Sequence, residues 1–294
     1  MVLEFIFKKI SKILAGHGFG NIPVLAKIYL KIGKTVLPKF IEYDDHNFFL
    51  ESEDSVNLAI FGYEHEKFEL NLFKNSLKKG DVVLDMGANI GLYSLAAAKI
   101  VGNSGKIYSF EPDPITFKNL KKNIESNKYN NVELINKAVS NKTGTITFTS
   151  SENITSRSKN HIKTADEQEK NSIKIHTIKM DDFFENKNNV INVIKMDIEG
   201  AEFEALKGMK KIIDKNIHLK IFLEFSPFML KRLNTDIAEM INFFKSYNFK
   251  INKINEEEDK LEEISLESLL EFSEEVDPTK ALNLYCFRYD QIRC

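Results

Sequence analysis

The sequence contains only two cysteines, Cys286 and Cys294, and no Cys-x-x-Cys pair. Two cysteines cannot form the disulfide framework of a small secreted domain, and no Cys/His cluster for zinc is present. The chain also lacks any window of about 18 uncharged apolar residues, so no transmembrane helix is predicted. The opening segment MVLEFIFKKISKIL places lysines after its apolar residues and shows no clear signal-peptide cleavage site. These absences favour a reducing, cytoplasmic location.

An excess of charge of one sign is missing as well, because the formal net charge is −2 over 294 residues. A chain this close to neutral does not attract nucleic acid as a whole. The 23 phenylalanines are not interleaved with arginines in a stacking ladder. The six histidines include no pair at metal-ligand spacing. We therefore expect no nucleic-acid partner and no histidine-bound metal.

Residues 1–42 differ from the rest, because they contain seven lysines and only two acids. Apolar residues from Leu3 to Leu14 recur at helical spacing. One interpretation is an amphipathic helix that contacts a membrane surface or an acceptor through residues 1–40. The other interpretation is a helix that packs on the main domain with its lysines in water.

Strands and helices alternate along most of the chain, which predicts βαβ units and a doubly wound, mostly parallel α/β sheet. We divide the chain into residues 1–61, a basic helical segment with a β-hairpin at 40–51, and residues 62–294, the main domain. The expected strands are 82–86, 106–112, 132–140, 144–149, 173–180, 192–197, 219–225, 249–254 and 281–289, and the expected helices are 64–77, 91–101, 114–127, 200–214 and 235–247.

Two polar stretches interrupt this alternation. Residues 150–172 lack a convincing period, and a loop of that length is usually disordered or functional. His161 lies in it and could approach an acceptor if the loop closes as a lid; the alternative is a surface histidine. Residues 256–277 are strongly acidic, and we expect a solvated helical excursion there.

The strand–helix corner VVLDMGANIG, residues 82–91, is the most informative stretch. Its strand carries Asp85 near its end, and Gly87 and Gly91 let the backbone turn sharply. Asn89 stands where a dinucleotide-binding G-x-G-x-x-G motif needs its middle glycine, and no Lys-Ser/Thr pair follows as in a P-loop. A carboxylate at this corner suits a ligand with an ammonium group better than one with phosphates.

A second carboxylate, Glu111, ends the next expected strand. A carboxylate in that place can accept two hydrogen bonds from the vicinal hydroxyls of a ribose. The corner therefore fits a nucleoside with free hydroxyls, a cationic head and no pyrophosphate. S-adenosylmethionine meets that description.

Four segments of the chain resemble the FkbM family of class I S-adenosylmethionine-dependent methyltransferases. The most specific of them ends a strand in D-x-E-G-x-E and opens a helix, which is the hallmark of the family. The likeness covers about residues 62–254 and implies a Rossmann-like methyltransferase fold with a seven-stranded-type sheet. The four segments are VVLDMGANIG (82–91), SFEPDP (109–114), NKAVS with GTITF (136–148) and IKMDIEGAEFEALKG (194–208).

The resemblance also implies cofactor-binding positions at the ends of four strands. The turn after the first strand would line the methionine end, and the acid ending the second would bind the ribose hydroxyls. Residues after the third strand would neighbour the adenine, and an acid after the fourth would face the methyl group and the acceptor. In that order the residues are Asp85, Gly87, Asn89 and Gly91; Glu111 and Pro112; Asn136 and Ala138; and Asp197.

Three acids, Asp197, Glu199 and Glu202, lie close together around Gly200. Acids this close repel, so we expect a raised pKa for at least one of them unless a cation or a helix N-terminus balances the charge. Our hypothesis is that Asp197 or Glu199 is the general base or orients the acceptor. Glu202 could contact the substrate or only stabilise the first turn of a helix, and a bound Mg²⁺ or Ca²⁺ is a third interpretation. Glu224, in LEFSP, could reach the acceptor or cap the next turn.

The expected reaction is transfer of a methyl group from S-adenosylmethionine to a hydroxyl of a sugar, glycan or secondary metabolite. One alternative is an N-methyltransferase, whose amine acceptor needs less assistance from a base. The other alternative is a non-catalytic module that binds S-adenosylmethionine without turnover.

Overall fold

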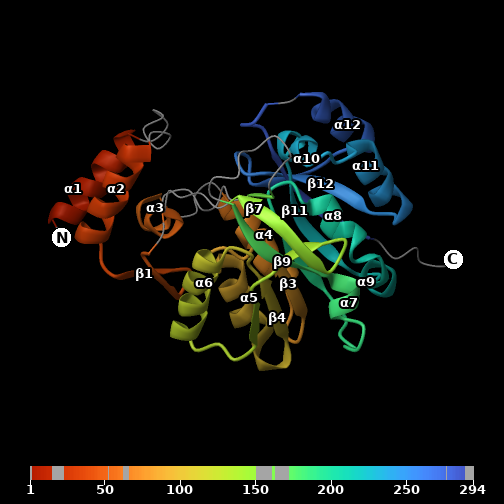
Figure 1. Cartoon of the computed structure of the whole chain (residues 1–294), viewed down its shortest axis with the longest axis horizontal. Helices are drawn as coiled ribbons and strands as arrows, with labels where there is room; N and C mark the ends of the chain where they lie inside the picture. The colour runs from red at the N-terminus through yellow and green to blue at the C-terminus, as the bar shows by residue number, and fades with distance from the viewer. Residues whose placement is uncertain are drawn as a thin grey trace.

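The computed structural model describes residues 2–14, 23–51, 53–61, 66–149, 161–162, 172–275 and 277–288. A large twisted sheet runs through the molecule, with helices on both faces (Figure 1). Its strands are β3 (Val82–Met86), β4 (Lys106–Phe110), β5 (Val132–Ile135), β10 (Val193–Met196), β11 (Lys220–Phe225), β12 (Lys250–Asn255), β13 (Lys260–Glu263) and β14 (Leu282–Phe287).

The order of these strands is β13-β12-β14-β11-β10-β3-β4-β5. The five strands from β11 to β5 run parallel, and β14 is antiparallel to both of its neighbours. The chain leaves β3 towards β4 and β5 on one side and returns to β10 and β11 on the other. In such sheets the crevice at the carboxyl ends of the strands, where the order reverses, is the usual ligand site. The predicted doubly wound α/β fold is confirmed, with β13 making an eighth, edge strand beyond the seven expected.

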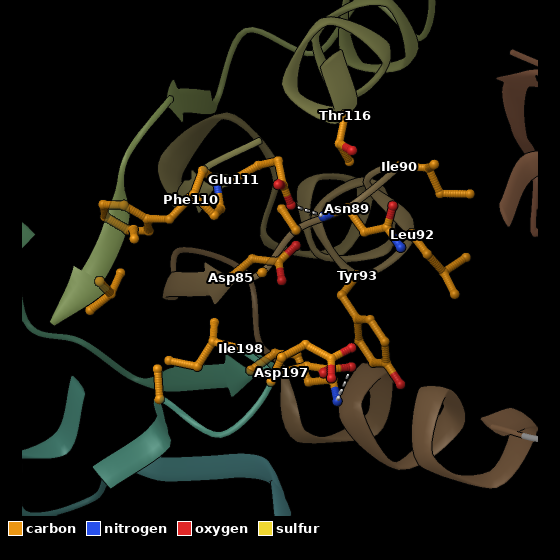
Figure 2. A pocket seen from close by; sticks show the side chains of 18 of the residues that line it. Asp85, Asn89, Ile90, Leu92, Tyr93, Phe110, Glu111, Thr116, Asp197 and Ile198 are labelled. Carbon is orange, nitrogen blue, oxygen red and sulfur yellow. Dashed lines mark hydrogen bonds and ion pairs between the residues drawn. The ribbon is translucent and has the colours of Figure 1, made fainter. Parts of the chain in front are cut away.

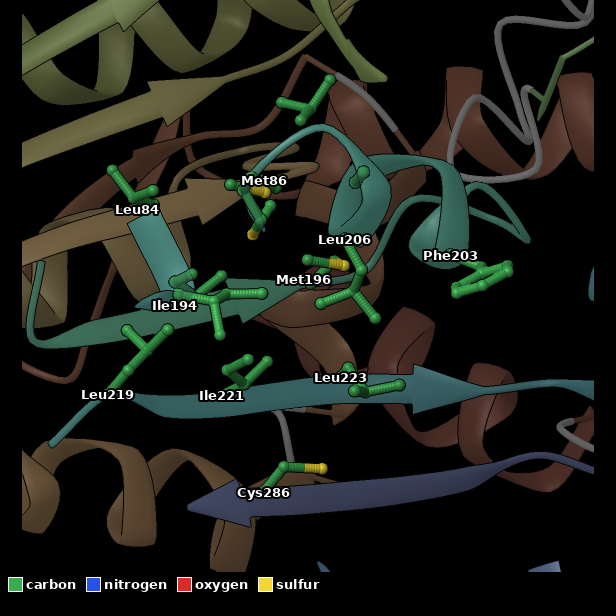
Figure 3. Packing of buried hydrophobic residues seen from close by; sticks show 14 of the residues in the cluster. Leu84, Met86, Ile194, Met196, Phe203, Leu206, Leu219, Ile221, Leu223 and Cys286 are labelled. Atoms are coloured by element: carbon green, nitrogen blue, oxygen red, sulfur yellow. The ribbon is translucent and has the colours of Figure 1, made fainter. Parts of the chain in front are cut away.

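Alternation of side chains along the central strands divides the core between the two faces of the sheet. On one face, Leu84, Met86, Ile194 and Met196 join one apolar cluster (Figure 3). The helices over this face are α7 (Met180–Phe183), α8 (Glu202–Lys207), α9 (Lys210–Lys215), α10 (Pro227–Arg232), α11 (Ile237–Ser246) and α12 (Leu266–Glu274).

On the opposite face of the sheet, the side chains change from apolar to polar towards the carboxyl ends of the strands. Val83, Val193, Ile107 and Phe222 pack under α4 (Lys67–Ser76), α5 (Leu92–Val101) and α6 (Pro114–Ser126). Two residues further along β3, β4 and β10, this same face carries polar side chains instead. That change marks where the apolar core ends and the candidate site begins.

A second, four-stranded sheet has the order β6-β9-β7-β8. It contains β6 (Ala138–Ser140), β7 (Gly144–Thr149), β8 (His161–Ile162) and β9 (Ser172–Lys179). The prediction of one strand over 132–140 is therefore wrong, because the chain leaves the central sheet after Ile135 and re-pairs from Ala138 with β9. Apart from β8, the polar stretch 150–171 lies outside the described residues, and so does the side chain of His161.

Several other expected elements have different bounds. The expected helix 200–214 is two helices, because the chain breaks at Gly208 and Met209 between α8 and α9. The expected strand 106–112 ends at Phe110. In the acidic stretch, the expected helix is α12, and the strand β13, which pairs with β12, precedes it and was not predicted. A short helix, α3 (Glu53–Phe61), was not predicted.

The N-terminal region contains α1 (Val2–Leu14), α2 (Pro23–Val36) and the hairpin β1 (Phe40–Tyr43)–β2 (His46–Phe49). At the turn of the hairpin, Asp44 and Asp45 take the left-handed conformation, and His46 and Asn47 pair with β1. Phe48 is fully buried in the core cluster of α4 and α5, so the hairpin packs into the main body. No helix in the described part of the chain is long and apolar enough to cross a membrane.

Candidate active site

A row of polar side chains crosses the middle of the sheet beneath α4 and α5. Lys195 of β10 pairs in register with Asp85 of β3, and Asp85 pairs with Ser109 of β4. All three are buried. Each of these residues is the last but one of its strand, so the row lies close to the carboxyl ends of the strands, at the point where the strand order reverses.

Asp85 is held by a hydroxyl from the helix that follows it. Ser94 Oγ of α5 donates to Asp85 Oδ2 at 2.5 Å and lies 2.6 Å from Ser109 Oγ. Burial raises the pKa of Asp85 to about 6, although the hydrogen bond from Ser94 and the nearby Lys195 ammonium both oppose the shift. A cationic ligand beside this carboxyl group would therefore stabilise its ionised form.

Lys195 is 3% exposed and forms a buried ion pair with Glu69 of α4, with 3.0 Å between Nζ and Oε1. Its Nζ also lies 4.0 Å from Asp197 Oδ2 and 4.9 Å from the centre of the Tyr93 ring. Burial alone would lower the pKa of Lys195, but the carboxylates of Glu69, Asp197 and Glu66 outweigh it and raise the pKa. The lysine therefore stays cationic and compensates several acids at once.

Glu66 borders the same group of charges, just before α4 begins. Its Oε2 accepts a hydrogen bond of 3.3 Å from the Tyr93 hydroxyl. Burial raises the pKa of Glu66 to about 7, against the influence of Lys195. Glu66 and Tyr93 thereby form one wall of the cleft.

Most backbone amides of the turn after β3 donate hydrogen bonds to other groups of the protein. Gly87 N and Ala88 N both donate to Phe110 O, at 2.9 and 3.0 Å, and Gly91 N donates to Ala88 O at 2.8 Å. Asn89 N donates to Glu111 Oε2 at 3.1 Å. A phosphate-binding loop needs such amides to be directed at the ligand. The geometry therefore supports the sequence-based exclusion of a pyrophosphate at this corner.

Glu111 is fixed at the carboxyl end of β4 by its neighbours. Its Oε1 accepts from Asp113 N at 2.9 Å, and Asp113 in turn caps α6. The side-chain amide of Asn136 donates to the backbone oxygens of Glu111 and Pro112, at 2.7 and 3.1 Å. Asn136 does not line the cleft, and its effect on the site is to hold the backbone that carries Glu111.

Asp197 follows β10 directly, and its side chain is 42% exposed. The backbone of Asp197 lies close to the turn after β3, and only a glycine at position 87 allows this. A Cβ on Gly87 would be 1.9 Å from the Asp197 carbonyl oxygen. Glu199 has a left-handed backbone, with φ of 56°, and Gly200 has φ of 95°. A Cβ on Gly200 would lie 2.5 Å from Met229 O, so the turn packs tightly against α10.

Glu202 and Glu224 do not line the cleft. Glu202 is 1% exposed, and its Oε1 accepts hydrogen bonds from Ile198 N at 3.0 Å and Gly200 N at 3.3 Å. Burial raises the pKa of Glu202 to about 7. Burial, followed by the charge of Asp197, raises the pKa of Glu224 to about 8. Glu202 thus supports the backbone that presents Asp197 and Glu199.

A cleft with ≈ 1060 Å³ of empty space, part of it open to solvent, joins these groups. Figure 2 shows Asp85, Glu111 and Asp197 directed towards a common space, with Asn89 and Tyr93 beside it. Eight predicted site residues line the cleft, whereas Gly91, Asn136, Glu202 and Glu224 do not. The eight are Asp85, Gly87, Asn89, Glu111, Pro112, Ala138, Asp197 and Glu199.

Several lining residues were missed by the sequence analysis, notably Lys195, Glu66, Tyr93, Thr116 and Lys137. Only Lys195 left a local signal: a lysine in the interior of a strand flanked by apolar residues must be paired when it is buried. The partner Glu69 was visible as an acid beside Leu70 and Phe73 of the buried helix face. Joining the two requires tertiary structure.

The cleft suits the sulfonium and ammonium of S-adenosylmethionine in two respects. Five carboxylates against two lysines line it, which favours a cationic ligand (Glu66, Asp85, Glu111, Asp197 and Glu199; Lys137 and Lys195). Asn89 Oδ1 is buried at its wall and has no hydrogen-bond partner among the residues that the structure describes. A buried acceptor without a donor is rare in proteins, and a ligand donor would satisfy it. In the described ranges, no group of three His, Cys, Asp or Glu side chains is placed to hold a metal ion.

Comparison with known proteins shows the family of the chain. The methyltransferase FkbM domain matches residues 85–251, more than half of the chain. The chain belongs to the FkbM methyltransferase family. It is a methyltransferase, and its cofactor is S-adenosylmethionine.

The hexuronic acid methyltransferase AglP of Haloferax volcanii is 27% identical over 237 residues, which cover 79% of this chain and 91% of that protein. Methyltransferase 1 of Beauveria bassiana is 25% identical over 144 residues, 43% of this chain and 57% of that protein. A solved S-adenosylmethionine-dependent O-methyltransferase from Thermotoga maritima is 11% identical with a TM-score of 0.41, over 91% of this chain and 82% of that one. At that identity and TM-score, the structural likeness supports no statement about function.

Removing the buried cation should destabilise the FkbM domain more than removing its partner acid. Lys195→Met should lower the free energy of unfolding by about 3–5 kcal/mol, because Glu69 is left buried without a cation. Glu69→Gln should cost less, since Lys195 keeps Glu66 and Asp197 nearby. Lys195→Met/Glu69→Gln should recover most of the loss. Chemical denaturation of the four proteins at neutral pH measures this order, and equal losses in Lys195→Met and the double variant would contradict it.

The raised pKa of Glu224 should make the protein without cofactor lose stability as the pH rises. The folded protein holds a proton that the unfolded chain releases near pH 4.5, so the stabilisation is complete below that value and is lost as the pH passes about 8. Glu224→Gln cannot ionise and should be more stable than wild type by about 1 kcal/mol or more at high pH. Melting temperatures across this range, with the exposed Glu271→Gln as control, provide the measurement. A wild-type-like pH profile in Glu224→Gln would refute the assignment.

Proposed function

We propose that the chain transfers a methyl group from S-adenosylmethionine to a hydroxyl group of a sugar or glycan. The observation that carries this proposal is the placement of Asp197, a half-exposed carboxylate at the carboxyl end of β10 that opens into the cofactor cleft. The similarity to a hexuronic acid methyltransferase supports a sugar as the acceptor.

The residues of the chain divide the work of binding between them. Asp85 and the orphan oxygen of Asn89 would receive the ammonium end of the cofactor. Glu111 would accept hydrogen bonds from the ribose hydroxyls, since an ionised carboxylate has lone pairs for about four hydrogen bonds. Ala138 and Val139 supply an apolar wall for the adenine. When bound, S-adenosylmethionine supplies an electrophilic methyl group.

Asp197 and Glu199 stand where an acceptor can enter. We assign Asp197 as the group that accepts the hydroxyl proton while the new C–O bond forms and the S–C bond breaks. Lys195 Nζ lies 4.0 Å from Asp197 Oδ2, and its positive charge attracts that carboxylate. Glu199, whose strained backbone directs it to the cleft, would orient the acceptor.

Glu111→Ala should weaken binding of S-adenosylmethionine and S-adenosylhomocysteine at least about tenfold, measured by titration calorimetry. A direct contact predicts a further effect: wild type should prefer S-adenosylhomocysteine to an analogue without the 2′ and 3′ hydroxyls, and Glu111→Ala should not. The control is Glu125→Ala, on the exposed side of α6. Undiminished discrimination in Glu111→Ala would show that Glu111 acts only on the fold of the turn.

Asp197→Asn should lower the single-turnover rate of methyl transfer to a sugar hydroxyl about 100-fold, the usual effect of losing a general base. Methyl glycosides of uronic acids and of neutral sugars are the acceptors to test first, with labelled S-adenosylmethionine. Glu204→Gln is a matched control, because Glu204 lies in the first turn of α8 and pairs with Lys207 on the surface.

Full rates in both Asp197→Asn and Glu199→Gln would overturn the assignment of a base. Transfer to amines that is insensitive to both substitutions would indicate an N-methyltransferase. Binding of the cofactor without turnover on any acceptor would favour a non-catalytic module.

A further inference from the structure

Exposed apolar side chains are concentrated at one end of the molecule. Among the described residues, twelve large hydrophobic side chains are exposed, and eight of them lie between Leu3 and Phe40. The other four, at Ile115, Val190, Ile217 and Leu270, are spread over the rest of the chain. Single exposed hydrophobic residues are ordinary, but a cluster of this kind marks an interaction surface.

On α1 four of the five exposed apolar residues form a continuous stripe, Leu3, Ile6, Ile10 and Ile13, which are 69%, 45%, 50% and 63% exposed. The spacing i, i+3, i+7, i+10 places them on one side of a helix. We call these four residues the α1 stripe. It is an outer face of a helix, and not the face by which that helix packs on the protein.

The inner face of α1 is already in contact with its neighbours. The ring of Phe7 lies 5.2 Å from the ring of Tyr29 on α2, and Ser11 is buried. Phe7 also packs on the cluster formed by Val56 and Ile60 of α3. In Figure 1, α1 and α2 lie side by side at one end, on the far side of α3 from the sheet. The main body therefore leaves the α1 stripe uncovered.

The segment that carries this apolar surface is also rich in exposed lysines. Residues 1–42 carry seven lysines and two acids, whereas the whole chain has a net charge of −2. Lys9, Lys31, Lys34 and Lys39 are exposed, and the one acid of α1, Glu4, is paired with Lys8 at 3.0 Å. On α2, Ile28 and Ile32 are 49% and 45% exposed beside these lysines.

We propose that α1 and α2 dock the enzyme on an anionic lipid surface, with the α1 stripe entering the headgroup region and the lysines contacting the headgroups. Charge complementarity selects this occupant: exposed lysines around an apolar face match anionic lipids and would repel the same face of a second copy. Both helices are too short to span a bilayer, so they lie along its surface. The docking is independent of the cofactor cleft, to which neither helix contributes a residue.

Flotation of the full chain with vesicles tests this docking, without cofactor or acceptor. The protein should float with phosphatidylcholine vesicles that contain about 30% phosphatidylserine and stay behind with phosphatidylcholine alone. Raising the salt from about 0.1 M to about 0.5 M should weaken binding severalfold. Lys31→Gln/Lys34→Gln should weaken it on the anionic vesicles only.

The triple variant Ile6→Ser/Ile10→Ser/Ile13→Ser should reduce the partition coefficient at least about tenfold. These side chains are exposed, so the fold should survive. Val190→Ser/Ile217→Ser/Leu270→Ser makes the same chemical change at exposed sites elsewhere and should bind like wild type. Methyl transfer to a water-soluble acceptor should be equal in all variants, which separates this proposal from the proposed function.

Two results would overturn the proposal. One is equal flotation of wild type and the α1-stripe variant, or no flotation of wild type on anionic vesicles. The other is a wild-type dimer in sedimentation velocity that becomes a monomer in the triple variant, which would assign the α1 stripe to contact with a second copy.

Discussion

A buried lysine enclosed by carboxylates is the interaction on which the site depends. Lys195 and Glu69 are 3% and 0% exposed, and removing two such charges from water is unfavourable unless they are closely paired. The pair joins β10 to α4, and Tyr93 of α5 lies against the ammonium. Three elements distant in sequence are thereby fixed around one charge. The position of Asp197, two residues after Lys195, follows from that constraint.

Glycines determine how closely the ends of the strands approach. Any Cβ at Gly87 would overlap the carbonyl oxygen of Asp197, and any Cβ at Gly200 would overlap that of Met229. Both residues also have positive φ, which glycine adopts without strain. The turns after β3 and β10 can therefore meet, and Asp85 and Asp197 open into the same cleft. The D-x-G and E-G motifs of the family have a steric basis as well as a chemical one.

The sequence predicts the parts of the fold and of the site that a local pattern determines. It does not predict the parts that depend on tertiary contacts. The strand 82–86 matches β3 residue for residue, because an apolar run bounded by a polar turn and two glycines has one simple interpretation. The split of 132–140 into β5 and β6 was missed, since the apolar pattern continues while the pairing partner changes from β4 to β9. Glu202 lies only five positions after Asp197, yet it turns inward to bond the backbone of Ile198 and Gly200. Tertiary contacts decide both the pairing of a strand and the direction of a side chain, so the spacing of residues in the sequence does not predict them.

The electrostatics of the cleft determine which kind of ligand it prefers. Burial raises the pKa values of Asp85 and Glu66 to about 6 and about 7, so a proton competes for each carboxylate near neutral pH. A cationic ligand in the cleft stabilises the ionised carboxylates, because it neutralises the negative charge that a bound proton would otherwise neutralise. The single charge of Lys195 cannot balance all of these acids, and its closest partner is Glu69. The cleft therefore carries more negative than positive charge, and a cationic ligand balances it. For this reason the cleft favours a sulfonium cofactor over a neutral or a phosphorylated nucleoside.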